Sequence, residues 1–248
     1  MNARFCIFTF GRDAEMTAIL VKYLRHCGAD KVVVIDDGGN PFNPQEVEAV
    51  KALGAVYQVS SWKRGGNLNG KEAVQNVLTD LVQHSAGVEW VVKVDADTLP
   101  QREFFDFLLS DKEYDLVACG HNDPAKPIMG ACYALRPPAV LRLQVASAYL
   151  VPGSRLPEDV TVGKLAVQEG LVIRTCKLGY QDYHRPGIFL KNVPSFAVCF
   201  GFVTDVAGNN ARTKDRYGKF VAVKMQGFLD MKSACRPPAK VKHTEEPT

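Results

Sequence analysis

Two aspartates, Asp95 and Asp97, stand one residue apart directly after the apolar run 90–94. Side chains two positions apart on an extended chain point to the same side, so these carboxylates repel unless a cation lies between them. A hard divalent ion such as Mg²⁺ or Mn²⁺, shared with phosphate oxygens, meets this need. The alternative is a turn in which Asp97 caps the next helix, with Pro100 in its first turn. The spacing alone leaves both interpretations open.

The first hundred residues alternate short apolar runs with amphipathic segments. Runs typical of buried strands occupy residues 5–10, 32–35, 55–59 and 90–94. Helical spacing is found over residues 13–27, 44–53 and 71–84. This alternation predicts an α/β fold with a mostly parallel sheet covered on both faces. Ligands of such sheets bind beyond the carboxyl ends of the strands, where Asp36–Asp37 and Asp95–Asp97 both fall.

The second half of the sequence is less regular. It predicts strands over residues 114–119, 129–135 and 171–176, and helices over 139–147, 160–169 and 212–233. An apolar helical pattern containing Phe104, Phe105, Leu108 and Leu109 also follows Pro100. We expect one domain over residues 1–235, with a nucleotide-binding half (1–100) and an acceptor-side half (101–235). The polar, proline-rich residues 236–248 are expected to form a mobile tail.

Composition limits the partners and the compartment. The chain has 248 residues, 46% of them hydrophobic, and a net charge of +3, which is too mild to indicate nucleic acid as a partner. The longest apolar runs are too short for a transmembrane helix, and the N-terminal residues do not resemble a secretory leader. Seven cysteines without a C-x-x-C pair, three of them in apolar runs (Cys6, Cys119, Cys199), predict buried free thiols. We therefore expect a cytoplasmic protein.

Five short motifs follow one another in a characteristic order. They are Asp36-Asp37-Gly38, the stretch 66–76 from Gly66 to Asn76, Asp95-x-Asp97, Gly130-Ala131 before Arg136, and Glu158-Asp159. Over residues 4–185 this order resembles the family 2 glycosyltransferases of the GT-A fold. The resemblance implies a GT-A-like domain with a mixed central sheet flanked by helices. It also implies transfer of a hexose or N-acetylhexosamine from a nucleoside diphosphate, usually with inversion and with Mn²⁺ or Mg²⁺, to a glycan, lipid-linked or other hydroxyl acceptor.

The donor side has two groups of candidates near the first two strands. Asp36 and Asp37 end a strand, where a carboxylate can accept the N3–H of uracil, although Asp-Gly is also a strong turn signal. Thr9 near the end of the first strand, and Gly11 and Arg12 after it, are expected to contact the donor through ribose or phosphate. Asp13 beside them could instead serve only as a helix cap.

A glycine-rich stretch precedes the third helix. Gly65, Gly66 and Gly70 allow close backbone approach, and Lys71 stands at a helix start, where phosphate is attracted. An ordinary loop explains the glycines equally well.

The pair Glu158–Asp159 forms a second centre. Inverting transfer is an in-line displacement, in which a carboxylate accepts the proton of the attacking hydroxyl. The resemblance implies that Asp159 is this base, with Glu158 supporting the acceptor. The alternative is an acidic first helical turn that complements the helix dipole.

Further candidates follow the last clear strand. His184 is a candidate third metal ligand, because GT-A enzymes often supply a histidine from this side, and Arg185 is a candidate partner for the diphosphate. A surface histidine is the alternative. We interpret the basic residues of the segment 212–224 as a solvated helix face rather than a cover for the leaving diphosphate.

Three functions compete. The first is a metal-dependent inverting glycosyltransferase, with UDP favoured as the donor nucleotide. The second is a sugar-1-phosphate nucleotidyltransferase, which needs a glycine- and arginine-rich signature of which residues 8–13 supply a fragment. The third is a non-catalytic nucleotide-sugar-binding domain. The combined motifs favour the first.

Overall fold

A seven-stranded sheet forms the centre of the computed structural model, which describes residues 1–9, 11–63, 68–110, 113–120, 127–153, 155–176, 178–180, 197–200 and 217–231. The strand order is β3-β2-β1-β4-β7-β6-β8. The strands are β1 (Ala3–Thr9), β2 (Lys31–Asp36), β3 (Val56–Val59), β4 (Trp90–Asp95), β6 (Leu116–Cys119), β7 (Met129–Leu135) and β8 (Ile173–Cys176). β7 runs antiparallel to β4 and β6, and the other neighbours pair in parallel. The predicted α/β class with a mostly parallel mixed sheet is confirmed.

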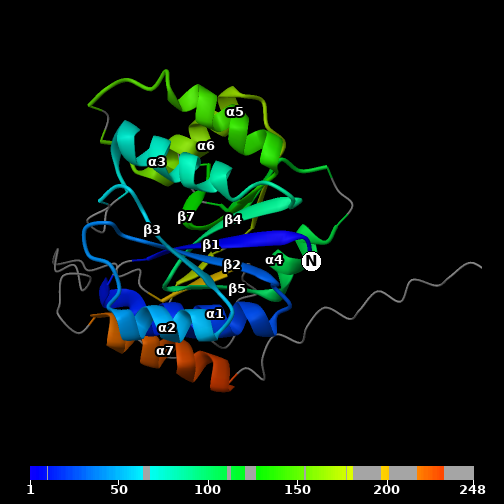
Figure 1. Cartoon of the computed structure of the whole chain (residues 1–248). Coiled ribbons are helices and arrows are strands. Elements are labelled where there is room, and N and C mark those ends of the chain that lie inside the picture. The colour runs from blue at the N-terminus through cyan, green and yellow to red at the C-terminus, as the bar shows by residue number, and fades with distance from the viewer. Residues whose placement is uncertain are drawn as a thin grey trace, which may run out of the picture.

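Helices cover both faces of this sheet (Figure 1). On one side lie α1 (Ala14–His26), which follows the 3-10 turn η1 (Gly11–Asp13), α2 (Pro44–Ala52) and α7 (Tyr217–Met231). On the other side lie α3 (Gly70–Gln83), α5 (Pro137–Ser147) and α6 (Glu158–Gln168). Alternate residues of β4 enter the two cores, Val92 and Val94 facing α1 and Val91 facing α3. The sheet is thus buried on both sides, as its apolar strands predict.

The parallel strands end at one edge of the sheet. In the register, Thr9 lies opposite Asp36 and Phe8 lies opposite Asp95. The carboxyl ends of β1, β2 and β4 therefore meet, which brings the first candidate residues of three strands to one place.

Most predicted elements occur within one or two residues of their expected bounds. Gly28 and Gly54 follow α1 and α2 with φ of +83° and +84°, values that favour glycine at a helix end. Helix α5 begins at Pro137, two residues earlier than predicted, because proline suits the first helical turn. Val221, Met225 and Phe228 of α7 are buried, as the pattern predicts.

The helix expected after Pro100 is present as α4, but the alternative in which Asp97 caps it with Pro100 in its first turn is wrong. Residues Thr98–Pro100 form β5, which pairs antiparallel with β10 (Ala197–Cys199), and β10 pairs with β9 (Leu178–Tyr180). Helix α4 (Arg102–Leu108) begins only after Gln101, its N-cap. Three buried residues and a hydrogen bond from the Tyr23 hydroxyl to the Pro100 carbonyl (2.5 Å) hold this segment extended. Asp97 is therefore not the cap of a helix.

The structure tests some of the expectations that were drawn from the composition. The six cysteines within the described residues are free, and Cys6, Cys119 and Cys199 are buried. No helix in the described ranges is long and apolar enough to cross a membrane. The tail 236–248 lies outside the described residues, and the compartment stays a prediction.

Candidate active site

A buried lysine stands at the centre of the candidate site. Lys93 of β4 has a side chain only 1% exposed, on the face covered by α3. Its ammonium donates to Asp95 Oδ1 at 2.6 Å and to the carbonyl of Gly130 in β7. It also lies 5.8 Å from the ring centre of Tyr133. One cation thus connects β4 with β7.

The charge of Lys93 depends on its acidic neighbours. Burial opposes the ammonium form, but the carboxylates of Asp95, Glu158 and Asp159 outweigh burial and raise the pKa of Lys93. The lysine therefore remains a cation inside the fold, and the three acids gain a fixed positive neighbour.

Gly130 extends this connection to the second centre. Its carbonyl accepts from Lys93, and its amide donates to Asp159 Oδ2 at 2.8 Å. A continuous set of contacts, which we call the Lys93–Gly130 link, therefore joins Asp95 to Asp159. A Cβ on Gly130 would lie 3.1 Å from the Cβ of Asp159, tighter than an ordinary contact. Glycine at this position lets β7 and the start of α6 approach each other.

The start of α6 is fixed by its own contacts. The amide of Glu158 donates to the Leu68 carbonyl at 2.7 Å, and Pro157 forms a bridge with Asn69. Asp159 Oδ1 accepts the Val160 amide at 2.8 Å. Both carboxylate oxygens of Asp159 thus accept backbone amides, which orients the group at a helix N-terminus that favours negative charge.

Glu158 lies deeper than its neighbour. It is 3% exposed and accepts a hydrogen bond from the Tyr133 hydroxyl. Burial raises the pKa of Glu158 to about 7, although Lys93 and the Tyr133 hydroxyl favour the ionised form. Burial and the neighbouring Glu158 in turn raise the pKa of Tyr133 well above its usual value. Near neutral pH Glu158 can therefore hold or release a proton.

Asp95 and Asp97 do not share one extended segment. The backbone turns at Ala96–Asp97, so the premise that both residues lie on one extended chain is wrong. Asp97 Oδ1 accepts from the Thr98 hydroxyl at 3.2 Å and from the Cys199 thiol at 3.7 Å, next to β10. Asp95 instead pairs with Lys93. Within the described ranges, no group of three His, Cys, Asp or Glu side chains forms a metal cage.

The end of β2 is organised around Asp36. Its buried carboxylate accepts the amides of Asp37 (2.8 Å) and Phe42 (2.6 Å) and the hydroxyl of Tyr57 (2.6 Å). Asp37 Oδ1 accepts the Gly39 amide at 2.9 Å, the geometry of a side-chain-supported turn. The predicted turn is therefore present, and the nucleobase role of both acids stays a prediction.

The end of β1 lies against this loop. The Gly11 amide donates to the Asn40 carbonyl at 2.7 Å, which ties η1 to the loop after β2. The hydroxyl of Thr9 hydrogen-bonds that of Thr17 at 2.8 Å. Arg12 Nε lies 3.6 Å from Asp13 Oδ1, and the Asp13 side chain makes no cap hydrogen bond to α1. Two strand ends thus form one continuous rim.

The structure gives Lys71 a packing role that was not predicted. Its ammonium donates to the carbonyls of Ala148 (2.7 Å) and Leu150 (2.8 Å), just beyond α5. A cation satisfies the carbonyls at a helix C-terminus, so Lys71 joins α3 to α5. Gly70 has a φ of +87° and its amide donates to the Leu156 carbonyl. Phosphate contact by either residue stays a prediction.

The remaining candidates lie outside the described residues. These are Gly65, Gly66, His184, Arg185 and the basic residues up to 216. Conversely, sequence reasoning missed Lys93, Tyr133 and Tyr57. A lone lysine within an apolar strand was a signal, because a buried lysine requires an acidic partner.

Comparisons with known proteins give remote structural likenesses. No protein-family model matches the sequence, and no curated protein matches it. Glucosyl-3-phosphoglycerate synthase from Mycobacterium tuberculosis, solved with Mn²⁺, UDP-glucose and phosphoglyceric acid, is 15% identical with a TM-score of 0.44, covering 70% of this chain and 68% of that chain. The inositol-1-phosphate CTP transferase from T. maritima is 11% identical with a TM-score of 0.49, covering 93% and 98%. At these identities the chemistry has to be argued from this chain's own residues.

Replacing Lys93 with methionine should destabilise the fold. The change leaves Asp95 and Glu158 without their shared cation, and removing one partner of a buried pair typically costs about 3–5 kcal/mol. Because the Asp95 side chain is 32% exposed, we expect a loss of about 3 kcal/mol in the free energy of unfolding, measured in urea. Lys51→Met, which breaks an exposed pair with Glu48, should cost less than about 1 kcal/mol. Equal losses in the two variants would contradict this role.

Stability should depend on pH through Glu158. Because burial raises the pKa of Glu158 from 4.5 to about 7, the folded protein binds this proton more tightly than the unfolded chain. The free energy of unfolding should therefore fall as pH rises from about 4.5 to 7. In Glu158→Gln this fall, measured in urea at several pH values, should shrink by on the order of 2–3 kcal/mol. The exposed Glu72→Gln is the control and should keep the wild-type slope; the same slope in Glu158→Gln would refute the assignment.

Proposed function

We propose that this chain is a metal-dependent inverting glycosyltransferase that moves a hexosyl or N-acetylhexosaminyl group from a UDP-sugar to an acceptor hydroxyl. The Lys93–Gly130 link carries the proposal. It connects a carboxylate at the end of β4, where nucleotide ligands of parallel sheets bind, with a carboxylate at the start of α6. If these carboxylates served only to support a turn and the start of a helix, they would not need a buried cation between them.

The proposed metal is Mn²⁺ or Mg²⁺. Asp97 would bind it directly, Asp95 through water or through the ribose, and His184 would be a third ligand. Carboxylate oxygens suit these hard cations, and Mg²⁺ is commonly held by one or two carboxylates together with substrate phosphates. When bound, the ion neutralises the charge that develops on the leaving diphosphate.

The nucleoside would lie over the rim formed by the ends of β1 and β2. Thr9, Gly11 and Arg12 would contact ribose or phosphate, and Asp36 and Asp37 would face the base. Gly70, Lys71 and Arg185 remain candidates for the diphosphate. The contact between Gly11 and the Asn40 carbonyl supports this placement, because it makes the two strand ends one surface.

Asp159 would act as the general base. It takes the proton of the acceptor hydroxyl while the new bond to the anomeric carbon forms and the bond to the diphosphate breaks, which inverts that carbon. Two amide donors hold its oxygens in a fixed direction, as a base must be held. Glu158, with a pKa of about 7, would support the acceptor from the buried side.

Two other functions remain as outcomes of the test. A nucleotidyltransferase would release pyrophosphate from a nucleoside triphosphate rather than a nucleoside diphosphate from a nucleotide sugar. A non-catalytic domain would bind nucleotide sugars without turnover.

Asp159→Asn should lower the rate of transfer by about 10²–10⁴-fold, because general-base catalysis typically contributes this much. The measurement uses a panel of nucleotide sugars with Mn²⁺ and follows release of nucleoside diphosphate, with water as acceptor where no better acceptor is known. Donor affinity should stay nearly unchanged, because the base contacts the acceptor and not the diphosphate.

The control is Asp115→Asn. Asp115 lies in the loop before β6, and its carboxylate accepts the Val172 amide away from this site. This variant should keep nearly the wild-type rate. An Asp159→Asn rate within about threefold of wild type would end the base assignment. A released sugar with retained anomeric configuration, seen by NMR, would end the inverting mechanism. Release of pyrophosphate from a nucleoside triphosphate and a sugar phosphate would favour the nucleotidyltransferase.

A further inference from the structure

Two residues from different parts of the chain hold the carboxylate of Asp97. Its Oδ1 accepts hydrogen bonds from the hydroxyl of Thr98, the next residue, and from the thiol of Cys199, which comes 102 residues later. Cys199 lies opposite Thr98 in the pairing of β10 with β5. The amide of Phe200 also donates to the Asp97 carbonyl at 2.9 Å. Asp97 is thus held through its side chain and through its backbone.

These contacts are buried and are supported by the last helix that the structure describes. Asp97 is 6% exposed, Cys199 3% and Thr98 0%. The ring of Phe200 packs edge to face on Phe228 of α7, with 5.4 Å between the ring centres. Helix α7 lies on one side of the central sheet (Figure 1). Close packing around buried side chains restricts their rotation, so the Asp97 carboxylate has a fixed direction.

The donors to Asp97 differ in charge from the donor to Asp95. Lys93 gives Asp95 an ammonium at 2.6 Å, which balances the charge of that carboxylate. Asp97 receives a hydroxyl and a thiol, which are neutral, and a thiol is a weak donor. Neutral donors orient a carboxylate without cancelling its charge, whereas an ammonium competes with a metal ion. Asp97 therefore suits direct binding of a divalent cation better than Asp95 does.

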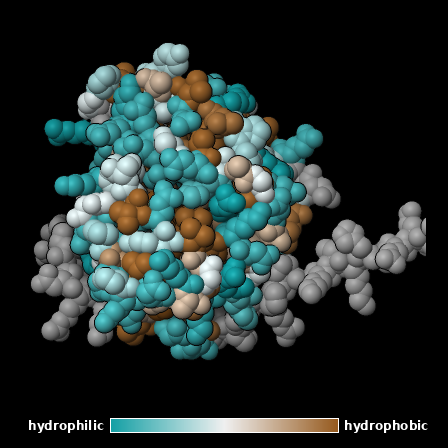
Figure 2. All heavy atoms as spheres, in the orientation of Figure 1, coloured by the Kyte–Doolittle hydropathy of each residue, from teal (hydrophilic) through white to brown (hydrophobic). Residues whose placement is uncertain are grey.

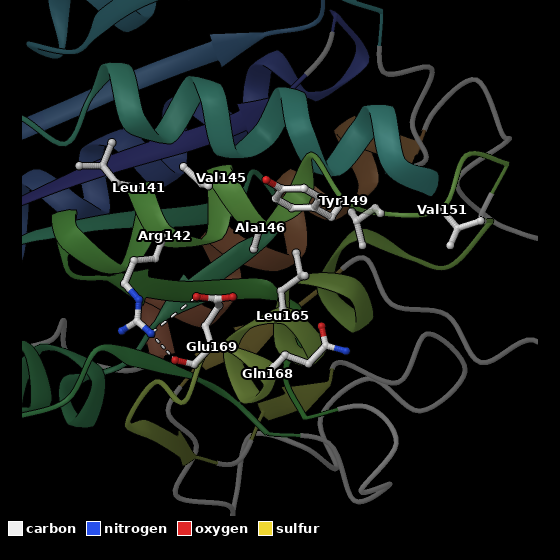
Figure 3. Close-up of a pocket in the computed structure, with 10 residues that line it drawn as sticks. Leu141, Arg142, Val145, Ala146, Tyr149, Val151, Leu165, Gln168 and Glu169 are labelled. Carbon is white, nitrogen blue, oxygen red and sulfur yellow. Dashed lines mark hydrogen bonds and ion pairs between the residues drawn. The ribbon is translucent and has the colours of Figure 1, made fainter.

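A groove on the outer surface differs from this site in its charge. It lies between α5 and α6 and has a volume of about 670 Å³. Among the described residues that line it, Arg142 and Glu169 are the only charged ones, and they pair with each other (Figure 3). Figure 2 shows hydrophobic residues scattered among hydrophilic ones on one face of the molecule. Because the charges of the groove are balanced, a metal ion shared with a diphosphate fits the strand ends better.

We propose that Cys199 and Thr98 are positioning residues, which fix the carboxylate of Asp97 for a divalent metal ion shared with the donor diphosphate. This inference rests on the proposed function, in which Asp97 is a metal ligand. Both residues act through Asp97 and not on the metal ion itself. Because they restrict the Asp97 side chain before the ion arrives, less rotational freedom is lost on binding. A strand near the end of the chain thereby sets the strength of metal binding at the end of β4.

Calorimetric titration of UDP in Mn²⁺ and in EDTA tests this positioning without acceptor or turnover. The measured quantity is the Mn²⁺ gain, which we define as the ratio of the UDP affinity in Mn²⁺ to that in EDTA. Cys199→Ala and Thr98→Val should each lower the gain by about fivefold, because each removes one hydrogen bond to the ligand. Cys199→Ser keeps a neutral donor and should retain more of the gain than Cys199→Ala.

The matched control is Cys27→Ala. Cys27 is also a buried thiol, 0% exposed, and it lies after α1, where the chain returns to the start of β2. This variant should keep the wild-type Mn²⁺ gain even if it is less stable, because a general loss of packing weakens UDP binding with and without Mn²⁺ alike.

The outcomes separate the positioning from the proposed function. If Asp97→Asn loses the Mn²⁺ gain while Cys199→Ala and Thr98→Val keep it, the positioning is overturned and the proposed metal site stands. An equal loss of the gain in Cys27→Ala also overturns the positioning. A wild-type protein without any Mn²⁺ gain overturns the proposed metal site together with this inference.

Discussion

The buried ammonium of Lys93 is the constraint on which the candidate site depends. A lysine that is 1% exposed has lost its water, and it stays charged only because acidic groups replace that water. Those groups come from the end of β4 and from the start of α6, and the carbonyl of Gly130 supplies a further acceptor. Two centres that are far apart in sequence must therefore lie close together whenever the protein is folded, before any substrate binds.

The mixed sheet makes this arrangement possible. Because β7 runs antiparallel to β4, its first residues lie beside the carboxyl end of β4, with Cys132 opposite Val94. A parallel strand in the same position would start at the opposite edge of the sheet. Gly130 can therefore accept from Lys93 with its carbonyl and donate to Asp159 with its amide. The reversal of one strand thus places the acceptor-side acids beside the nucleotide-side acids.

Much of the fold could be predicted, because apolar periodicity records which side of each element is buried. The edge holding Asp36 and Asp95 followed from the parallel order of the early strands. The strand β5 after Asp97 could not be predicted, because it depends on pairing with β10, about a hundred residues later in the chain. The hydrogen-bond partners of Lys71 could not be predicted either. They are backbone carbonyls beyond α5, and every residue type has such a carbonyl. The sequence shows that Lys93 is a lone charge in an apolar strand. Its contact with Gly130 could not be predicted without knowing that β7 runs antiparallel to β4.

The most direct test of the account is calorimetric titration of UDP into the protein with Mn²⁺ or with EDTA. A site in which Asp97 shares a metal ion with the diphosphate predicts that UDP binds more tightly in Mn²⁺. Asp97→Asn should lose most of this gain, whereas Asp106→Asn, an exposed acid of α4, should keep it. Equal UDP affinity in Mn²⁺ and in EDTA, or an undiminished metal effect in Asp97→Asn, would contradict the account.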